Sequence, residues 1–187
     1  MPGGDTAETG GRLLVIGADH RTAPPAWRDQ FAIIEANLGA ELDRLRAMGF
    51  GDLTLLATCE RIELITIGSG TEVALRKFAM HLADQLGTTP EHLASALYAH
   101  EGERALRHLF AVASSLQSLV LGEPHILGQL RSAHRIASEA GLVSGDLEAT
   151  LQGVFAAARR VRRETRIGPR RARRATSSRA SAISCSL

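Results

Sequence analysis

The chain has 187 residues and contains little cysteine, few aromatic residues and no long apolar run. Two cysteines, Cys59 and Cys185, are too few for a disulfide framework, so we expect a reducing, cytoplasmic setting. No segment approaches the roughly 18 consecutive apolar residues of a membrane helix, which excludes a helical membrane-spanning protein. Residues 1–12 carry no apolar core, so they are predicted to form a disordered start rather than a secretory signal.

Common cofactor and metal signatures are absent as well. The sequence contains neither G-x-x-x-x-G-K-[ST] nor G-x-G-x-x-G, so it has neither a P-loop nor a Rossmann fingerprint. The histidines follow no recognised zinc spacing, and the nearest cysteine is far from them in the chain. No metal site is therefore expected.

Basic charge is concentrated near the end of the chain. Residues 159–179 hold ten arginines against the single Glu164, whereas residues 1–158 hold 12 basic and 19 acidic side chains. Such a stretch is a candidate contact for a polyanion. It is equally consistent with a solvated helix face or with a tail that has no partner. Residues 169–187, rich in arginine and serine, are predicted to be a disordered tail.

The first hundred residues alternate between strand and helix patterns. The apolar periodicity predicts two amphipathic helices, at 35–48 and 71–86, and four strands, at 13–18, 53–57, 61–67 and 96–99. The two middle strands are close enough to form a hairpin, and the proline-bearing segment 19–25 is expected to be a loop. The order β-α-β-β-α-β predicts an α+β fold of the ferredoxin-like split βαβ type, with helices covering one face of an antiparallel sheet.

Everything after Glu103 has helical periodicity, in three segments at 103–119, 124–140 and 146–167. We therefore expect a helical annex that ends in a long C-terminal helix with Asp146 as its N-cap.

Two residues could carry chemistry. Cys59 follows a strand, and Arg61 would project to the same side if the backbone is extended, which would favour the thiolate. The alternative is that Cys59 is a small core residue. His108, within an apolar helical segment, is either the edge of a packed face or a group of tunable pKa that assists acyl transfer.

Four segments together resemble the N-terminal part of the glutamyl-tRNA reductase family. They occur in the order and spacing of that family and are GADHRTAP (17–24), TCERIEL (58–64), RHLFAVASSLQSLVLGEPHILGQL (107–130) and RRVRRETRIG (159–168). The resemblance makes residues 13–145 the reductase-like N-terminal domain and residues 146–168 the start of a long linker helix.

The resemblance implies an enzyme of the five-carbon route to tetrapyrroles, which uses NADPH to reduce the glutamyl ester on tRNA to glutamate-1-semialdehyde. Cys59 would be the thiolate that attacks the ester and forms a thioester, and Arg61 would bind the substrate carboxylate. Thr58, His108 and Ser118 match polar residues of the same pocket. The implied partners are glutamyl-tRNA, glutamate-1-semialdehyde aminotransferase and a second copy of the chain.

The sequence also departs from the family pattern. Glu60 stands where asparagine is usual, Gln117 replaces an aspartate and His125 replaces a glutamine, while Glu123 and Gln129 keep their places as substrate-binding residues. The segment after 168 does not resemble the continuation into the NADPH-binding and dimerisation domains. The sequence therefore leaves three hypotheses: a reductase lacking its reduction step, a non-catalytic regulator that binds tRNA or a protein partner, and an inactive truncated product.

Overall fold

A four-stranded antiparallel sheet forms the centre of the computed structural model, which describes residues 11–119, 122 and 125–165. The strand order is β2-β3-β1-β4, and each neighbouring pair is antiparallel. The strands are β1 (Arg12–Asp19), β2 (Asp52–Ala57), β3 (Arg61–Gly68) and β4 (Tyr98–Glu101). This is the order of a ferredoxin-like split βαβ unit, so the predicted α+β architecture is confirmed.

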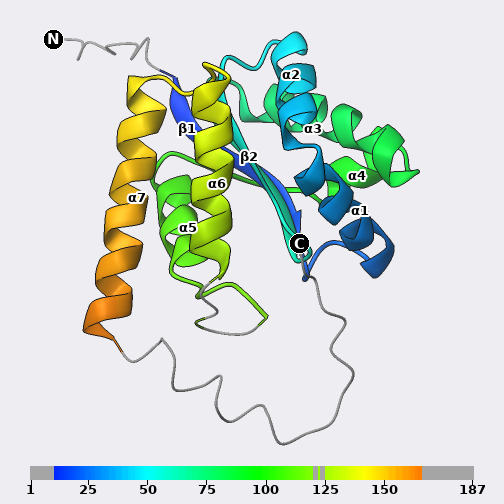
Figure 1. Ribbon diagram of the computed structural model, residues 1–187. Coiled ribbons are helices and arrows are strands. Elements are labelled where there is room, and N and C mark those ends of the chain that lie inside the picture. The colour runs from blue at the N-terminus through cyan, green and yellow to red at the C-terminus, as the bar shows by residue number, and fades with distance from the viewer. Residues whose placement is uncertain (1–10, 120–121, 123–124, 166–187) are drawn as a thin grey trace, which may run out of the picture.

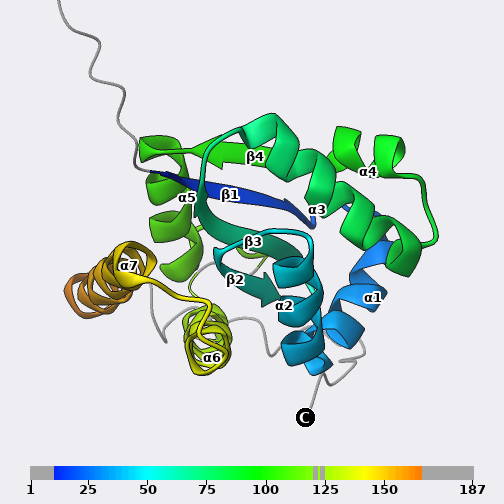
Figure 2. The same cartoon turned by 90° about the horizontal axis from the view of Figure 1, so that it is seen from above.

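Helices cover both faces of this sheet (Figures 1 and 2). One face packs against α1 (Pro25–Ala36), α2 (Leu38–Ala47), α3 (Thr71–Leu86) and α4 (Pro90–Ala96). The other packs against α5 (Glu103–Ala113), α6 (His125–Glu139) and α7 (Gly145–Glu164), which together form the predicted annex. Successive strand residues face opposite sides, so Leu14 and Ile16 enter the first core and Val15 enters the second.

Several predicted boundaries were wrong for identifiable reasons. The helix expected at 35–48 is α2, at Leu38–Ala47. The sequence pattern missed the helix before it, α1, which begins at Pro25 because proline is well suited to the first turn, where its missing N–H costs nothing. The same chemistry starts α4 at Pro90, where the Thr89 side chain accepts a hydrogen bond from the His92 N–H at 3.2 Å.

Other predicted helix and strand ends also differ from the structure. The fourth strand lies at 98–101 instead of 96–99, the helix predicted to reach 119 ends at Ala113, and Ser144 rather than Asp146 precedes the last helix. β1 includes Arg12, which the sequence pattern assigned to the disordered start. Residues 1–10, the end of the predicted linker helix at 166–168 and the tail at 169–187 lie outside the described residues.

The segment between α6 and α7 lies along the outer edge of β2. The Leu53 N–H donates to the Leu142 carbonyl oxygen at 2.8 Å. The Ser144 N–H donates to an Asp52 carboxylate oxygen at 2.5 Å, and the Ser144 hydroxyl contacts the other oxygen of the same carboxylate. These contacts join the annex to the edge strand.

Candidate functional site

A two-residue hairpin turn carries Cys59 at one end of the sheet. The Thr58 N–H donates to the Arg61 carbonyl oxygen at 2.8 Å, which closes the turn around Cys59 and Glu60. The Thr58 hydroxyl oxygen accepts from the backbone N–H groups of Glu60 and Arg61, both at 3.2 Å. Thr58 is buried and Cys59 is exposed. The alternative of Cys59 as a core residue is therefore wrong, and so is the extended backbone from which its alignment with Arg61 was inferred.

A buried charge network lies just below this turn, on the sheet face covered by the annex. Its centre is Glu63, of which one oxygen, Oε1, has three partners. Arg61 Nη1 donates at 3.0 Å, the Tyr98 hydroxyl donates at 2.5 Å, and His108 Nε2 lies 2.7 Å away. The side chains of Arg61 and Glu63 are both 0% exposed. Three elements, β3, β4 and α5, thus meet at one carboxylate.

The network keeps Glu63 ionised. Burial acts to raise the pKa of this carboxyl, but hydrogen bonds from His108 and Tyr98 and the charge of Arg61 outweigh burial and hold the pKa at about 2. Burial and the charge of Glu63 raise the pKa of Tyr98 far above its usual range, so its hydroxyl remains a donor. Burial and the neighbouring His108 lower the pKa of His100, whose ring centroid is 4.6 Å from that of His108.

Gly17 makes the space for this network. In β1 it is paired with Glu63, and a Cβ atom at this position would lie 2.2 Å from the Ile62 carbonyl oxygen and 2.9 Å from Glu63 Cγ. Only a residue without a side chain fits there.

The loop that follows α5 closes over the network. Arg61 Nη2 donates to the Gln117 carbonyl oxygen at 2.5 Å, and Arg21 Nη2 donates to the Gln117 side-chain oxygen at 3.2 Å. The Leu119 N–H donates to Glu60 Oε2 at 3.3 Å. Residues 114–119 therefore contact both the Cys59 turn and the buried arginine beneath it. Glu60 and Gln117 form these contacts.

Two buried polar atoms of the network have no hydrogen-bond partner among the described residues: Arg61 Nε and Glu63 Oε2. A buried donor without an acceptor costs free energy. The Arg61 guanidinium therefore has unused capacity for an anionic oxygen, although its two Nη atoms already bond Glu63 and the loop.

The other residues expected at the site are distributed differently. Ser118 is half-buried in the same loop, next to Gln117. Gln129 instead donates to Glu35 Oε1 at 3.2 Å, and both line a separate hollow of about 530 Å³ beside Ala57. Burial raises the pKa of Glu35, although its hydrogen bond with Gln129 opposes the rise. Glu123 lies outside the described residues.

Sequence interpretation missed Glu63 and Tyr98 as site residues. The available signal was the segment 61–67, in which Arg61 and Glu63 alternate with apolar residues. Because helices cover both faces of this sheet, these two charges had to be buried, and a buried pair of charges needs hydrogen-bonding neighbours.

The described residues do not fit the phosphates of NADPH. Two glycine-bearing connections among them lead from a strand to a helix: Gly68-Ser69-Gly70 between β3 and α3, and Gly102 between β4 and α5. Neither has the three spaced glycines of a dinucleotide fingerprint, and each is followed by a glutamate in the first turn of the helix, Glu72 or Glu103, where a carboxylate would repel a pyrophosphate. No group of three or more metal-ligating side chains is found within residues 11–119, 122 and 125–165. None of the described helices is long and apolar enough to cross a membrane.

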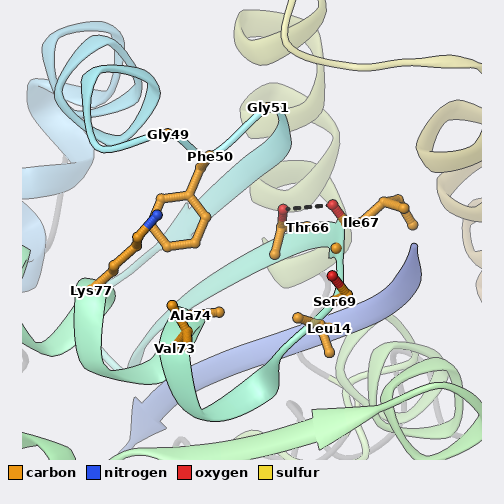
Figure 3. Close-up of a pocket in the computed structure, with 11 residues that line it drawn as sticks. Leu14, Gly49, Phe50, Gly51, Thr66, Ile67, Ser69, Val73, Ala74 and Lys77 are labelled. Carbon is orange, nitrogen blue, oxygen red and sulfur yellow. Dashed lines mark hydrogen bonds between the residues drawn. The ribbon is translucent and has the colours of Figure 1, made fainter. Parts of the chain in front are cut away.

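A second hollow, of about 520 Å³, lies at the opposite end of the sheet (Figure 3). Lys77, the only lysine of the chain, lies over the Phe50 ring with Nζ 5.8 Å from its centroid. Leu14 and Gly68 also line this hollow, and they belong to the ends of β1 and β3 that lie away from Cys59. It is therefore separate from the candidate site.

Fold and site define a class: an α+β domain that presents a cysteine on a sheet hairpin above a buried acid–base network. The family described as "Glutamyl-tRNAGlu reductase, N-terminal domain" matches residues 16–165. The chain belongs to the glutamyl-tRNA reductase family.

Individual relatives agree with this assignment. The chain is 43% identical over 157 residues to a glutamyl-tRNA reductase of Alcanivorax borkumensis and 42% identical over 155 residues to that of Rhodospirillum rubrum. These matches cover 83% and 82% of this chain, but only 37% and 36% of the relatives. Among solved structures, the glutamyl-tRNA reductase from Methanopyrus kandleri superposes with a TM-score of 0.61 at 26% identity, covering 84% of this chain and 36% of that one. The chain thus spans little more than a third of the length of these relatives.

Proposed function

We propose that this chain is the substrate-binding, thiol-bearing part of a glutamyl-tRNA reductase. The observation that carries the proposal is the exposed Cys59 on a tight turn directly above the buried Arg61–Glu63–His108 network. A nucleophile needs to be both held and accessible, and the hydrogen bonds of Thr58 hold this turn while its tip is exposed.

The proposed chemistry is acyl transfer from tRNA to sulfur. The Cys59 thiolate attacks the carbonyl carbon of the glutamyl ester, and a C–S bond forms. The bond from that carbon to the ribose oxygen breaks, and the ribose oxygen leaves with the electron pair and takes up a proton. Glu63 holds Nε2 of His108 at 2.7 Å, so we assign the proton transfer to Nδ1 of the same ring, which takes the proton of the Cys59 thiol and gives it to the leaving ribose oxygen.

Arg61 is the proposed partner of the substrate carboxylate. A guanidinium binds a carboxylate through a pair of parallel N–H donors, and Arg61 Nε has no acceptor among the described residues. The substrate carboxylate would take the place of the Gln117 carbonyl oxygen at Nη2, which requires the loop at 114–119 to move. Thr58 and Ser118 border this space, and roles in substrate binding for Glu123 and Gln129 remain proposals from family resemblance.

Reduction of the thioester to an aldehyde is proposed for the whole enzyme, with NADPH as the hydride donor. The residues described here do not fit that cofactor, so we assign them the acyl transfer alone. Cooperation with glutamate-1-semialdehyde aminotransferase, which would consume a reactive aldehyde, and association into a homodimer are further proposals of the same kind. So is a cytoplasmic location.

The test is direct detection of the acyl-enzyme. The chain is incubated with tRNA carrying radiolabelled glutamate, precipitated with acid, and treated with neutral hydroxylamine, which cleaves thioesters. We expect label on the protein that hydroxylamine releases, no label in Cys59→Ser, and normal labelling in the matched control Cys185→Ser. Equal labelling of the wild type and Cys59→Ser would refute the proposal.

A second candidate is binding of tRNA without chemistry. The observation that favours it is that both Nη atoms of Arg61 already donate hydrogen bonds, to Glu63 and to the Gln117 carbonyl oxygen. A substrate carboxylate would have to displace one of them. Tight tRNA binding by the wild type with no acyl-enzyme at any pH between about 6 and 9 would support this alternative.

A further inference from the structure

An arginine-lined hollow lies between α6 and α7. Its volume is about 950 Å³, and it is lined by Arg159, Arg162 and Arg163 together with Leu127 and Ala156. The three arginines are spaced i, i+3 and i+4 in α7, so they lie on one face of the helix. No carboxylate lines the hollow within the part of the chain that the structure describes.

Two of the three arginines that line the hollow, Arg159 and Arg163, form no ion pair with any described residue. Arg160, the arginine of α7 that does not line it, pairs with Glu164 at 2.9 Å. Burial and the charge of Arg131 lower the pKa of Arg162. Mutual repulsion of this kind is relieved when an anion binds between the guanidinium groups.

The hollow is connected to the candidate catalytic loop. Arg162 Nη2 donates to the Ser115 hydroxyl at 3.0 Å. Ser115 has a φ of 60°, and two residues later Gln117 bonds Arg61 below the Cys59 turn. A ligand in the hollow therefore contacts an arginine that holds the same loop as the site.

We propose that this hollow binds the phosphate backbone of the RNA that carries the glutamyl group. The inference rests on the proposed function and extends it from the ester to the carrier. Several phosphates in a row match a line of guanidinium groups along one helix face, and the open hollow gives an RNA strand room to lie across α6 and α7. The pyrophosphate of a dinucleotide has the same chemistry, and the experiment separates the two sources.

The probe is a fluorescent RNA hairpin with a single-stranded 3′ end and no amino acid attached. Its affinity for the full chain is measured by anisotropy at several salt concentrations. The test variant is the double substitution Arg159→Gln, Arg163→Gln. The control is Arg135→Gln, Arg160→Gln, which removes the same number of charges from α6 and α7, the two helices beside the hollow, but from arginines paired with Glu139 and Glu164. Both variants keep the arginines of the tail, so the tail contributes equally.

We expect the test variant to bind roughly tenfold more weakly. The slope of log K against log salt should fall by about 0.7 to 0.9 for each phosphate that the variant no longer binds. The control should stay within about twofold of the wild type. If both variants bind RNA equally weakly, the loss of affinity depends only on net charge, and the proposal is overturned. Displacement of RNA by NADPH, together with weaker NADPH binding by the test variant, would assign the hollow to a dinucleotide instead.

Failure of this inference is distinguishable from failure of the proposed function. If glutamate is transferred to Cys59 while the test variant binds RNA like the wild type, the acyl transfer stands and the hollow has no role in RNA binding. If the RNA hairpin binds through the hollow while Cys59 is never acylated, the RNA-binding site stands and the acyl transfer does not.

Discussion

Replacement of Glu63 by glutamine removes the charge at the centre of the buried network while keeping its shape. Glu63 is fully buried, and its pKa of about 2 lies well below the ordinary value of 4.5. A difference of that size corresponds to about 3 kcal/mol of folding stability at neutral pH. Breaking a buried ion pair by removing one partner costs about 3 to 5 kcal/mol, because the remaining charge is left unpaired. We therefore expect Glu63→Gln to lower the free energy of unfolding by about 3 kcal/mol.

The pH dependence has a definite sign. A carboxyl whose pKa is lower in the folded state stabilises the fold at pH values above its unfolded pKa, and this stabilisation is lost as the pH falls toward the folded pKa. The difference between the wild type and Glu63→Gln should therefore be constant above about pH 5 and shrink between about pH 4.5 and 2.

Urea unfolding followed by fluorescence provides the assay, because Trp27 is the single tryptophan and is buried in α1. Tyr98→Phe is a matched control that removes one hydrogen bond to the same carboxylate but no charge, and it should cost about 1.5 to 3 kcal/mol without the same acid dependence. A loss below about 1 kcal/mol for Glu63→Gln, or a loss that is unchanged down to about pH 2.5, would refute this account of the network.

Three further substitutions test packing, burial and a hydrogen bond in the sheet and its flanking helices. Gly17→Ala should lower the free energy of unfolding in urea by about 3 kcal/mol or more, because the alanine Cβ would lie 2.2 Å from the Ile62 carbonyl oxygen. A loss under about 1 kcal/mol would show that β1 and β3 can move apart to admit the methyl group. Glu35→Gln should raise the urea midpoint above that of the wild type at pH 7, because burial raises the pKa of the Glu35 carboxyl and so disfavours its charged form. The difference in midpoint should disappear as the pH falls, and a lower midpoint at pH 7 would contradict this. Asp52→Ala should cost about 0.5 to 1.5 kcal/mol, because the exposed Ser144 N–H exchanges its carboxylate partner for water, and faster amide exchange at Ser144 would check the cause.

The order of strands and helices could be predicted because the apolar pattern changes cleanly between periods of two and about 3.6 residues. The segments that begin with proline could not. The sequence pattern places Pro25 in a loop and predicts no helix at Pro90, although each proline opens a helix. Proline is common both in loops and in the first helical turn, so its presence alone does not distinguish the two.

The site was predicted in part. Cys59 and His108 follow from local motifs, and the structure places His108 in the buried network and Cys59 on the turn above it. Glu63, the common partner of Arg61, Tyr98 and His108, could not be found without the sheet register, because these partners come from three separate elements.

The hydrogen bond between Leu53 and Leu142 has a consequence for how copies of this chain meet. β2 is an outer strand, and unpaired edge groups invite a strand from another molecule to add to the sheet. At Leu53 that donor is already used by the α6–α7 connection, and the opposite outer strand, β4, offers only four residues. Edge-to-edge pairing of sheets from different molecules, a common first step toward fibrous aggregates, is therefore disfavoured at both edge strands.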